Sequence, residues 1–298
     1  MTRRGWLLFT SMGVIWGIPY LLIAVAVREV SPAAVVVART GIGALVLLPL
    51  AVRAGALRQL KGRWHVVLGF AVIEICVPFP LIAWAETRIP SGVSGLLIAT
   101  VPIWVAVLAV LGVDRSERIS PSRAAGLGLG LLGVAFLLGV DLSSKSELLG
   151  VAALLIAAVG YAGGALIIKH SLAAAPGLGT MAGGLGIATL VLAPLAWVTR
   201  PTQAPSGYAI AAIVVLGLLC TAVAFPLFFA LIGEVGASRT AVITYINTAI
   251  AVLLGVAVLD EQLTVGVSVG FVLVLLGSWL ATGGRLPSRY ARPSRRRG

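Results

Sequence analysis

The stretch GIGALVLLPLA, residues 41–51, recurs as GIATLVLAPLA at residues 186–196, with eight of eleven positions identical at an offset of 145. Two further segments recur in the same order at offsets of 146 and 144, namely PFPL (78–81) as AFPL (224–227) and ERISPSRAAGLGLGLLG (117–133) as EQLTVGVSVGFVLVLLG (261–277). Chance similarity is common in apolar sequence, but three colinear matches at almost one offset indicate a tandem duplication.

The composition around these repeats is that of a membrane protein. Apolar residues make up 59% of the 298 residues and charged residues 11%, against about 45–50% and 25% in soluble domains. Lipid offers no hydrogen bonds to backbone amides, so apolar segments of roughly 20 residues must cross it as helices. The sequence predicts ten such spans, at residues 6–27, 33–52, 64–85, 92–113, 122–140, 148–169, 178–199, 207–231, 237–259 and 264–284.

These spans form two units of five, residues 1–140 and 141–284, followed by an Arg-rich tail, residues 285–298, that is predicted to be disordered. Because five is odd, the second unit enters the membrane upside down relative to the first. Inverted repeats create a pseudo-two-fold axis in the membrane plane and let a central site face each side in turn. The expected fold is an all-α integral membrane protein of ten transmembrane helices in two inverted five-helix repeats.

The positive charges set the expected orientation, because cytoplasmic loops carry an excess of Lys and Arg. With the N-terminus inside, 17 of the 22 basic residues fall on the cytoplasmic side, 4 on the other side and one, Arg39, within a span. We therefore expect a multi-pass protein of the bacterial inner membrane with both termini in the cytoplasm. The Arg-rich tail is expected to contact anionic lipid rather than nucleic acid.

Several ordered motifs resemble a known family. The first half carries WGIPYLLIAVAV (16–27), ART (38–40) and SGVSGLLIATVPIWVAVLAVLG (91–112) followed by SERIS (116–120), and the second carries GASRTAVITYINTAIAVLLGVAVLDEQLT (236–264) and GFVLVLLGSWLATG (270–283). These motifs are similar to the two EamA-type repeats of the drug/metabolite transporter superfamily. The resemblance implies export or exchange of metabolites such as amino acids, sugars, nucleotide precursors or toxic compounds.

The chain also departs from the family pattern. Ser116 and Asp260 stand where the family usually has Gly, and Thr248 stands where a Pro is usual, whereas Pro102 keeps the Pro in the other half. A missing Pro removes an expected helix kink. The two halves are therefore expected to differ at this span.

Two charged residues fall well inside predicted spans, Arg39 in the second and Glu74 in the third. Placing either in lipid costs about 2.5–3.5 kcal/mol, so both should face the interior, where a mutual ion pair is the simplest compensation. One interpretation makes Glu74 a carboxylate that couples proton movement to transport, and the other makes the pair a structural link. Their counterparts in the second half are uncharged, Gly184 and Cys220.

Aromatic and amide side chains inside the spans form a second candidate set. Trp16 and Tyr161 are equivalent by the offset of 145, as paired walls of a central cavity would be. Tyr20, Trp104, Tyr245 and Asn247 would supply ring faces and hydrogen bonds to a partly apolar solute. The alternative for these residues is packing between helices. Glu117 and Glu261 precede predicted helix starts, where a carboxylate interacts favourably with the positive helix end.

The sequence favours a secondary transporter that moves small amino-acid-like or drug-like solutes, with export as the expected direction. The alternatives are an intramembrane enzyme, a channel and a non-transporting membrane scaffold. No catalytic motif and no metal-ligand spacing is visible, so no catalytic residue, metal or cofactor is expected. The expected partners are a small-molecule substrate, membrane lipid and protons, for a monomer or homodimer that does not bind nucleic acid.

Overall fold

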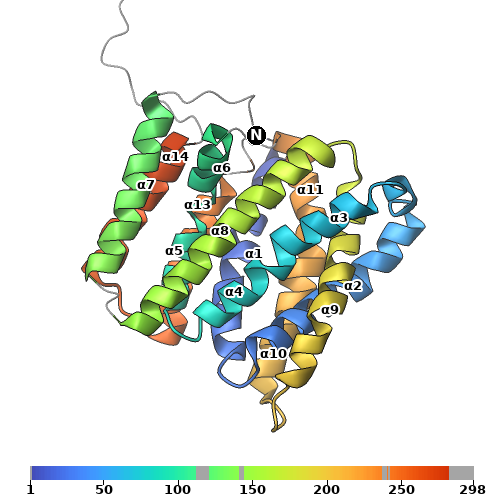
Figure 1. Ribbon diagram of the computed structural model, residues 1–298, viewed down its shortest axis with the longest axis horizontal. Helices are drawn as coiled ribbons and strands as arrows, with labels where there is room; N and C mark the ends of the chain where they lie inside the picture. The colour runs from blue at the N-terminus through green and yellow to red at the C-terminus, as the bar shows by residue number, and fades with distance from the viewer. Residues whose placement is uncertain (1, 112–120, 141–143, 237–239, 241, 282–298) are drawn as a thin grey trace, which may run out of the picture.

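A computed structural model describes residues 2–111, 121–140, 144–236, 240 and 242–281. Every regular element in these residues is helical (Figure 1). The first half contains α1 (Arg3–Ala26), α2 (Pro32–Arg53), η1 (Arg58–Leu60), α3 (Trp64–Ala71), η2 (Val72–Cys76), α4 (Pro78–Ala85), α5 (Ser91–Ile98), α6 (Val101–Val110) and α7 (Pro121–Val140). The second contains α8 (Lys145–Ser171), α9 (Gly177–Val198), α10 (Gly207–Gly217), η3 (Leu218–Val223), α11 (Ala224–Val235), α13 (Ile243–Leu259) and α14 (Val265–Ala281).

The helices have the length and composition of membrane spans. Within the described residues, 7 helical segments are long and apolar enough to cross a membrane, and three shorter apolar helices occupy 121–137, 243–259 and 265–281. Large apolar side chains such as Leu45, Leu190 and Val198 are exposed on the outside of the bundle, as expected of a surface that faces lipid. The all-α membrane class predicted from the sequence is thus confirmed.

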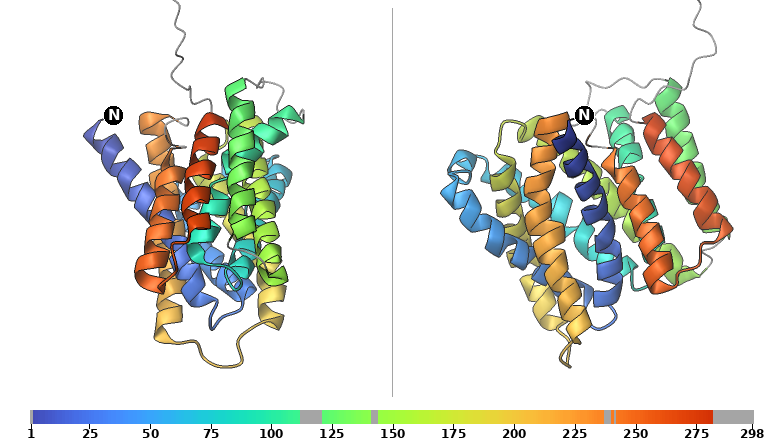
Figure 2. Two further views of the ribbon diagram at one scale, coloured as in Figure 1. Left: turned by 90° about the vertical axis from the view of Figure 1, so that its left-hand side faces the viewer. Right: turned by 180° about the vertical axis from the view of Figure 1, so that it is seen from behind.

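Corresponding helices of the two halves run in opposite directions. In Figure 1, α1 descends from the N-terminus while α8 ascends, and α2 ascends while α9 descends. The start of α1 and the end of α14 lie at the same end of the bundle (Figure 2). This end is called the N-terminal end below, and the other is called the far end.

Helix packing follows the same correspondence between the halves. Two contacts join counterparts directly, α2 with α9 and α7 with α14. The others come in related pairs: α1 packs on α10 and α11 as α8 packs on α3 and α4. Each half therefore meets the other mainly through equivalent surfaces.

Two glycines show the correspondence at the residue level. At the N-terminal end, a Cβ added at Gly5 of α1 would lie 3.1 Å from Val235 and 3.3 Å from Glu234. At the far end, a Cβ at Gly150 of α8 would lie 3.3 Å from Ile89 and 3.5 Å from Arg88. Gly150 is 145 residues after Gly5, and Glu234 and Val235 are 146 residues after Arg88 and Ile89. The same close contact thus occurs once at each end of the bundle.

Both halves also contain a π-helical turn at the same place. The turns are η2 and η3, whose first residues, Val72 and Leu218, are separated by the repeat offset of 146. In η2 the amide of Val77 bonds the carbonyl of Val72, five residues earlier, at 3.0 Å. Such turns are rare and are frequently found at functional sites.

Pro102 and Thr248 occupy equivalent positions, 146 residues apart, in the fourth and ninth predicted spans. The span containing Pro102 is divided into α5 and α6, since proline provides no amide for the helix ladder. The helix containing Thr248 runs unbroken from Ile243 to Leu259, and the Thr248 hydroxyl donates to Thr244 O at 2.9 Å. Residues 237–239 and 241 of the second span lie outside the described residues, so the expected difference between the two spans stays a prediction.

Candidate functional site

Arg39 lies half-buried in α2 and contacts the π-helical turn η3 of the second half and α4 of the first. Its Nε donates to Thr221 Oγ1 of η3 at 3.1 Å, and its guanidinium lies 4.3 Å from the ring centroid of Phe79 in α4. The Thr221 hydroxyl in turn donates to Leu216 O, five residues earlier, at 2.8 Å. The π-helical turn of the second half thus presents an oxygen to the cation of the first half.

Glu74 lies in η2, and the expected ion pair with Arg39 is not formed. The π-helical turn directs its carboxylate to α8, where a Cβ added at Gly164 would overlap with it. Glu74 Oε2 is buried and has no hydrogen-bond partner among the described residues. Arg39 is compensated by a hydroxyl and an aromatic face instead.

Trp16 and Tyr161, which the sequence places at equivalent positions, make equivalent ring contacts. Trp16 meets Phe225 edge to face, with centroids 5.8 Å apart and an interplanar angle of 72°. Tyr161 meets Phe79 edge to face at 6.4 Å and 72°. Phe79 and Phe225 are themselves 146 residues apart. Each pair therefore joins one half to the other. Of the two phenylalanine rings, only Phe79 is also in contact with the guanidinium of Arg39.

The charge of Arg39 acts on several polar groups in the interior. Tyr20, Glu86 and Tyr161 all interact electrostatically with it, and Tyr161 also interacts with Glu74. We call these five residues, Tyr20, Arg39, Glu74, Glu86 and Tyr161, the central cluster. Four of them were predicted from the sequence, and they come from α1, α2, η2 and α8.

The other predicted residues make contacts of their own. Trp16 also packs on Phe228, with centroids 4.7 Å apart, and Trp104 Nε1 donates to Thr100 Oγ1 at 3.2 Å. Asn247, with its amide oriented to satisfy both groups, donates to Gly13 O and Ile243 O at 2.9 Å. Asn247 therefore ties α13 to α1. Tyr245 is half-buried near the start of α13.

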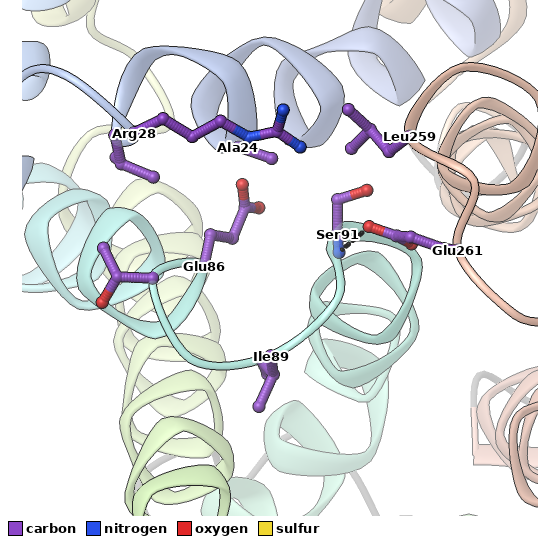
Figure 3. A pocket seen from close by; sticks show the side chains of 9 residues that line it. Ala24, Arg28, Glu86, Ile89, Ser91, Leu259 and Glu261 are labelled. Atoms are coloured by element: carbon purple, nitrogen blue, oxygen red, sulfur yellow. Dashed lines mark hydrogen bonds between the residues drawn. The ribbon is translucent and has the colours of Figure 1, made fainter.

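Glu86 is the member of the central cluster that the sequence did not single out. It follows α4 at the far end, is 8% exposed, and neither carboxylate oxygen has a hydrogen-bond partner among the described residues. Burial raises the pKa of the Glu86 carboxyl well above its usual range; the Glu261 charge adds to the rise and the Arg39 charge opposes it. The carboxylate points into a pocket of about 310 Å³ (Figure 3).

Glu261 also lines this pocket and stabilises a helix end, but not the predicted one. Its Oε1 accepts from Ser91 N at 2.6 Å and its Oε2 from Gly92 N at 2.9 Å. Both amides belong to the first turn of α5, so the carboxylate meets the positive end of α5 rather than that of α14. The reason is that Asp260 adopts a left-handed conformation, φ 55°, which turns the chain after α13. Glu117, its counterpart, lies outside the described residues.

A conventional metal site is not found in the part of the chain that the structure describes, which contains no group of three or more His, Cys, Asp or Glu side chains able to hold an ion. The polar groups of the central cluster are a guanidinium, two tyrosine hydroxyls and two carboxylates.

Comparison with known proteins supports a membrane transporter. The EamA-like transporter family matches residues 3–139 and, separately, residues 148–283. The uncharacterized inner membrane transporter YedA of Escherichia coli K12 is 27% identical over 284 residues, covering 91% of this chain and 90% of that protein. The uncharacterized transporter YvbV of Bacillus subtilis strain 168 is 24% identical over 271 residues, covering 90% and 88%.

A solved crystal structure shares the fold. It superposes with a TM-score of 0.67 at 20% sequence identity, covering 95% of this chain and 97% of that chain. The correspondence extends over both halves and therefore over the interior that holds the central cluster.

Proposed function

The chain belongs to the EamA-like transporter family, and from this premise we propose that it is a secondary transporter of the inner membrane. It exports small metabolites, amino-acid-like or drug-like solutes, by alternating access. The relatives described as transporters span nearly the whole chain, which supports a membrane transporter of the same size.

The proposed architecture is ten membrane spans in two inverted repeats, residues 1–140 and 141–284, with both termini in the cytoplasm. The opposite directions of α1 and α8 and the paired helix contacts support it. In this architecture the seven longer segments are seven of the spans, and the three shorter apolar helices are the other three. In this orientation the far end of the bundle faces away from the cytoplasm.

The observation that carries the proposal is the pair of equivalent contacts at the two ends. Gly5 meets Glu234 and Val235 at the N-terminal end, and Gly150 meets Arg88 and Ile89 at the far end. Both contacts are close in this structure. In alternating access one of them opens while the other stays closed, and exchange of the conformations of the two halves reverses which one is open. An inverted repeat makes such an exchange nearly isoenergetic, because each half adopts the other's conformation.

The central cluster lies on the proposed solute path. Arg39, Tyr20 and Tyr161 bind the solute, and Glu74 carries a proton. Intramembrane charges are costly and, when retained, usually mark substrate or proton pathways. The asymmetry supports this role, since the counterparts of Arg39 and Glu74 are Gly184 and Cys220, and a scaffold built only for packing has no need of the two charges.

The test is solute flux in liposomes that contain the purified protein. A metabolite panel is screened for uptake at two pH values, and the variants Arg39→Gln and Glu74→Gln are compared with Arg53→Gln. Arg53 is the matched control, because it lies exposed in the last turn of the same helix as Arg39. Arg39→Gln should abolish flux, Glu74→Gln should abolish its pH dependence, and Arg53→Gln should do neither. Equal flux and equal pH dependence in all three variants would remove the central cluster from the mechanism.

A further inference from the structure

The pocket at the far end contains two buried polar side chains, and no hydrogen bond to either pocket-facing group is found among the described residues. It lies where α1 and α13 end and α5 begins, and its volume is about 310 Å³ (Figure 3). Glu86, 8% exposed, and Ser91, 1% exposed, both line it. The two Glu86 carboxylate oxygens and Ser91 Oγ have no hydrogen-bond partner among the described residues. Such groups are rare in folded proteins, and each calls for a missing partner.

The unsatisfied groups define the charge of that partner. Glu261 is already occupied, since both of its oxygens accept amides of α5. Glu86 is therefore the one carboxylate of the pocket with both oxygens available. A carboxylate accepts hydrogen bonds only, and a buried one is stabilised most by a cationic donor.

Arg28 does not supply that donor. Its side chain is exposed, and in Figure 3 its guanidinium extends along α1 toward Leu259, while the Glu86 carboxylate lies below it. The guanidinium therefore sits at the rim, where it is solvated and repels a cation only weakly. Arg28 does, however, allow the preferred ligand charge to be tested, because its guanidinium would attract an anionic ligand.

Apart from Thr87, the rest of the lining is apolar. Ala24, Ile89 and Leu259 form walls on three sides of the two acceptors. A volume of about 310 Å³ is close to the lower limit of small-molecule sites, roughly 300 Å³. The pocket thus suits a short alkyl chain attached to one compact cationic group.

We propose that this pocket binds a small aliphatic primary amine, with its ammonium on the Glu86 carboxylate and Ser91 Oγ and its alkyl chain against the apolar walls. The three N–H donors of an ammonium match the three unsatisfied oxygen atoms. As a substrate class for the outer end of the solute path, the amine rests on the proposed transporter function. The proposal that the pocket binds an amine depends only on the residues of the pocket.

The experiment is a binding titration of the purified full-length protein with butylamine, 1-butanol and butanoate, which share one alkyl chain and differ in charge. Butylamine should bind and the other two should not. Glu86→Gln should weaken butylamine binding about tenfold or more, as expected for loss of a charge-assisted hydrogen bond. Arg28→Gln should strengthen it by a few-fold. Glu147→Gln is the matched control, because Glu147 lies near the start of α8, outside the pocket, and Gln retains its capping bond to Ser144.

Butanoate binding that is lost in Arg28→Gln, or butylamine binding that is equal in the wild type and Glu86→Gln, would overturn the proposal. If Glu86→Gln does not fold, Ser91→Ala takes its place, and unchanged butylamine affinity in that variant has the same meaning. Flux assays separate this site from the transporter function. Protein-dependent flux of another solute without butylamine binding overturns the amine site and leaves the transporter intact.

Discussion

The position of Arg39 could be predicted from the sequence, whereas the burial of Glu86 could not. Arg39 stands in the middle of an apolar span, so its interior position follows from the cost of exposing it to lipid. Glu86 stands at the end of a span, where carboxylates are normally solvated. It is buried because α1 and the chain after α13 cover it, and these segments are remote in sequence. The sequence around Glu86 therefore contains no pattern that predicts its burial.

The pH dependence of stability tests the environment of Glu86. Because burial raises its pKa in the folded protein, its protonated form contributes stability that is complete below the unfolded-state pKa and is lost as the pH rises through the folded-state pKa. Glu86→Gln stays neutral, so its Tm should exceed that of the wild type by a margin that grows as the pH rises above the unfolded-state pKa of the Glu86 carboxyl. Thermal unfolding in detergent measures this margin. A margin that does not change with pH would show that Glu86 is solvated.

Asp260 gives a second prediction at this scale. Its φ of 55° and ψ of 32° lie in the left-handed region, which costs an L-residue about 1–2 kcal/mol and glycine almost nothing. This conformation explains why the family usually has Gly here. Asp260→Gly should therefore be at least as stable as the wild type, and Asp260→Val should be less stable by about 1–2 kcal/mol. Equal Tm values for the Gly and Val variants would contradict the assigned conformation.

At the scale of helices, the apolar spans were predictable and the π-helical turns were not. Span positions follow from hydropathy and length, and the seven long apolar helical segments each overlap a predicted span. A π-helical turn inserts an extra residue into the ladder and changes which side chains face inward below it. That shift directs Glu74 to α8 instead of α2, which is why the Arg39–Glu74 pair was expected but not found.

The contact between α7 and α14 offers a prediction about helix packing. A Cβ added at Gly126 would lie 2.5 Å from Ala281 N and 2.6 Å from Gly277 O, so the two backbones touch there. Gly128, in the same helix, has nothing within 4 Å of such a Cβ. Gly126→Val should lose about 1–3 kcal/mol of stability through overpacking, whereas Gly128→Val should be tolerated. The comparison uses Tm in detergent, and equal losses would show that helix propensity, not packing, sets the effect.

At the scale of the whole molecule, the two halves are equivalent in packing and unequal in chemistry. The duplicated sequence predicted the first property, since Trp16 and Tyr161 take equivalent partners, Phe225 and Phe79. The chemical difference between the halves was indicated in the sequence only by Arg39 and Glu74, whose counterparts are uncharged. The structure adds what the sequence could not give: the residues that meet at each end, and the pocket next to Glu86.

Distances between spin labels at the two ends test the exchange of the halves most directly. The chosen pairs are Thr2 with Glu234 at the N-terminal end and Glu147 with Arg88 at the far end, which flank the equivalent contacts of Gly5 and Gly150. Labels are placed in a background in which Cys76 and Cys220 are replaced by Ala. Alternating access predicts two populations in liposomes, in which one distance lengthens while the other stays short, and their ratio should shift with substrate or pH. Two distances that each stay single under all conditions, or that lengthen together, would contradict it.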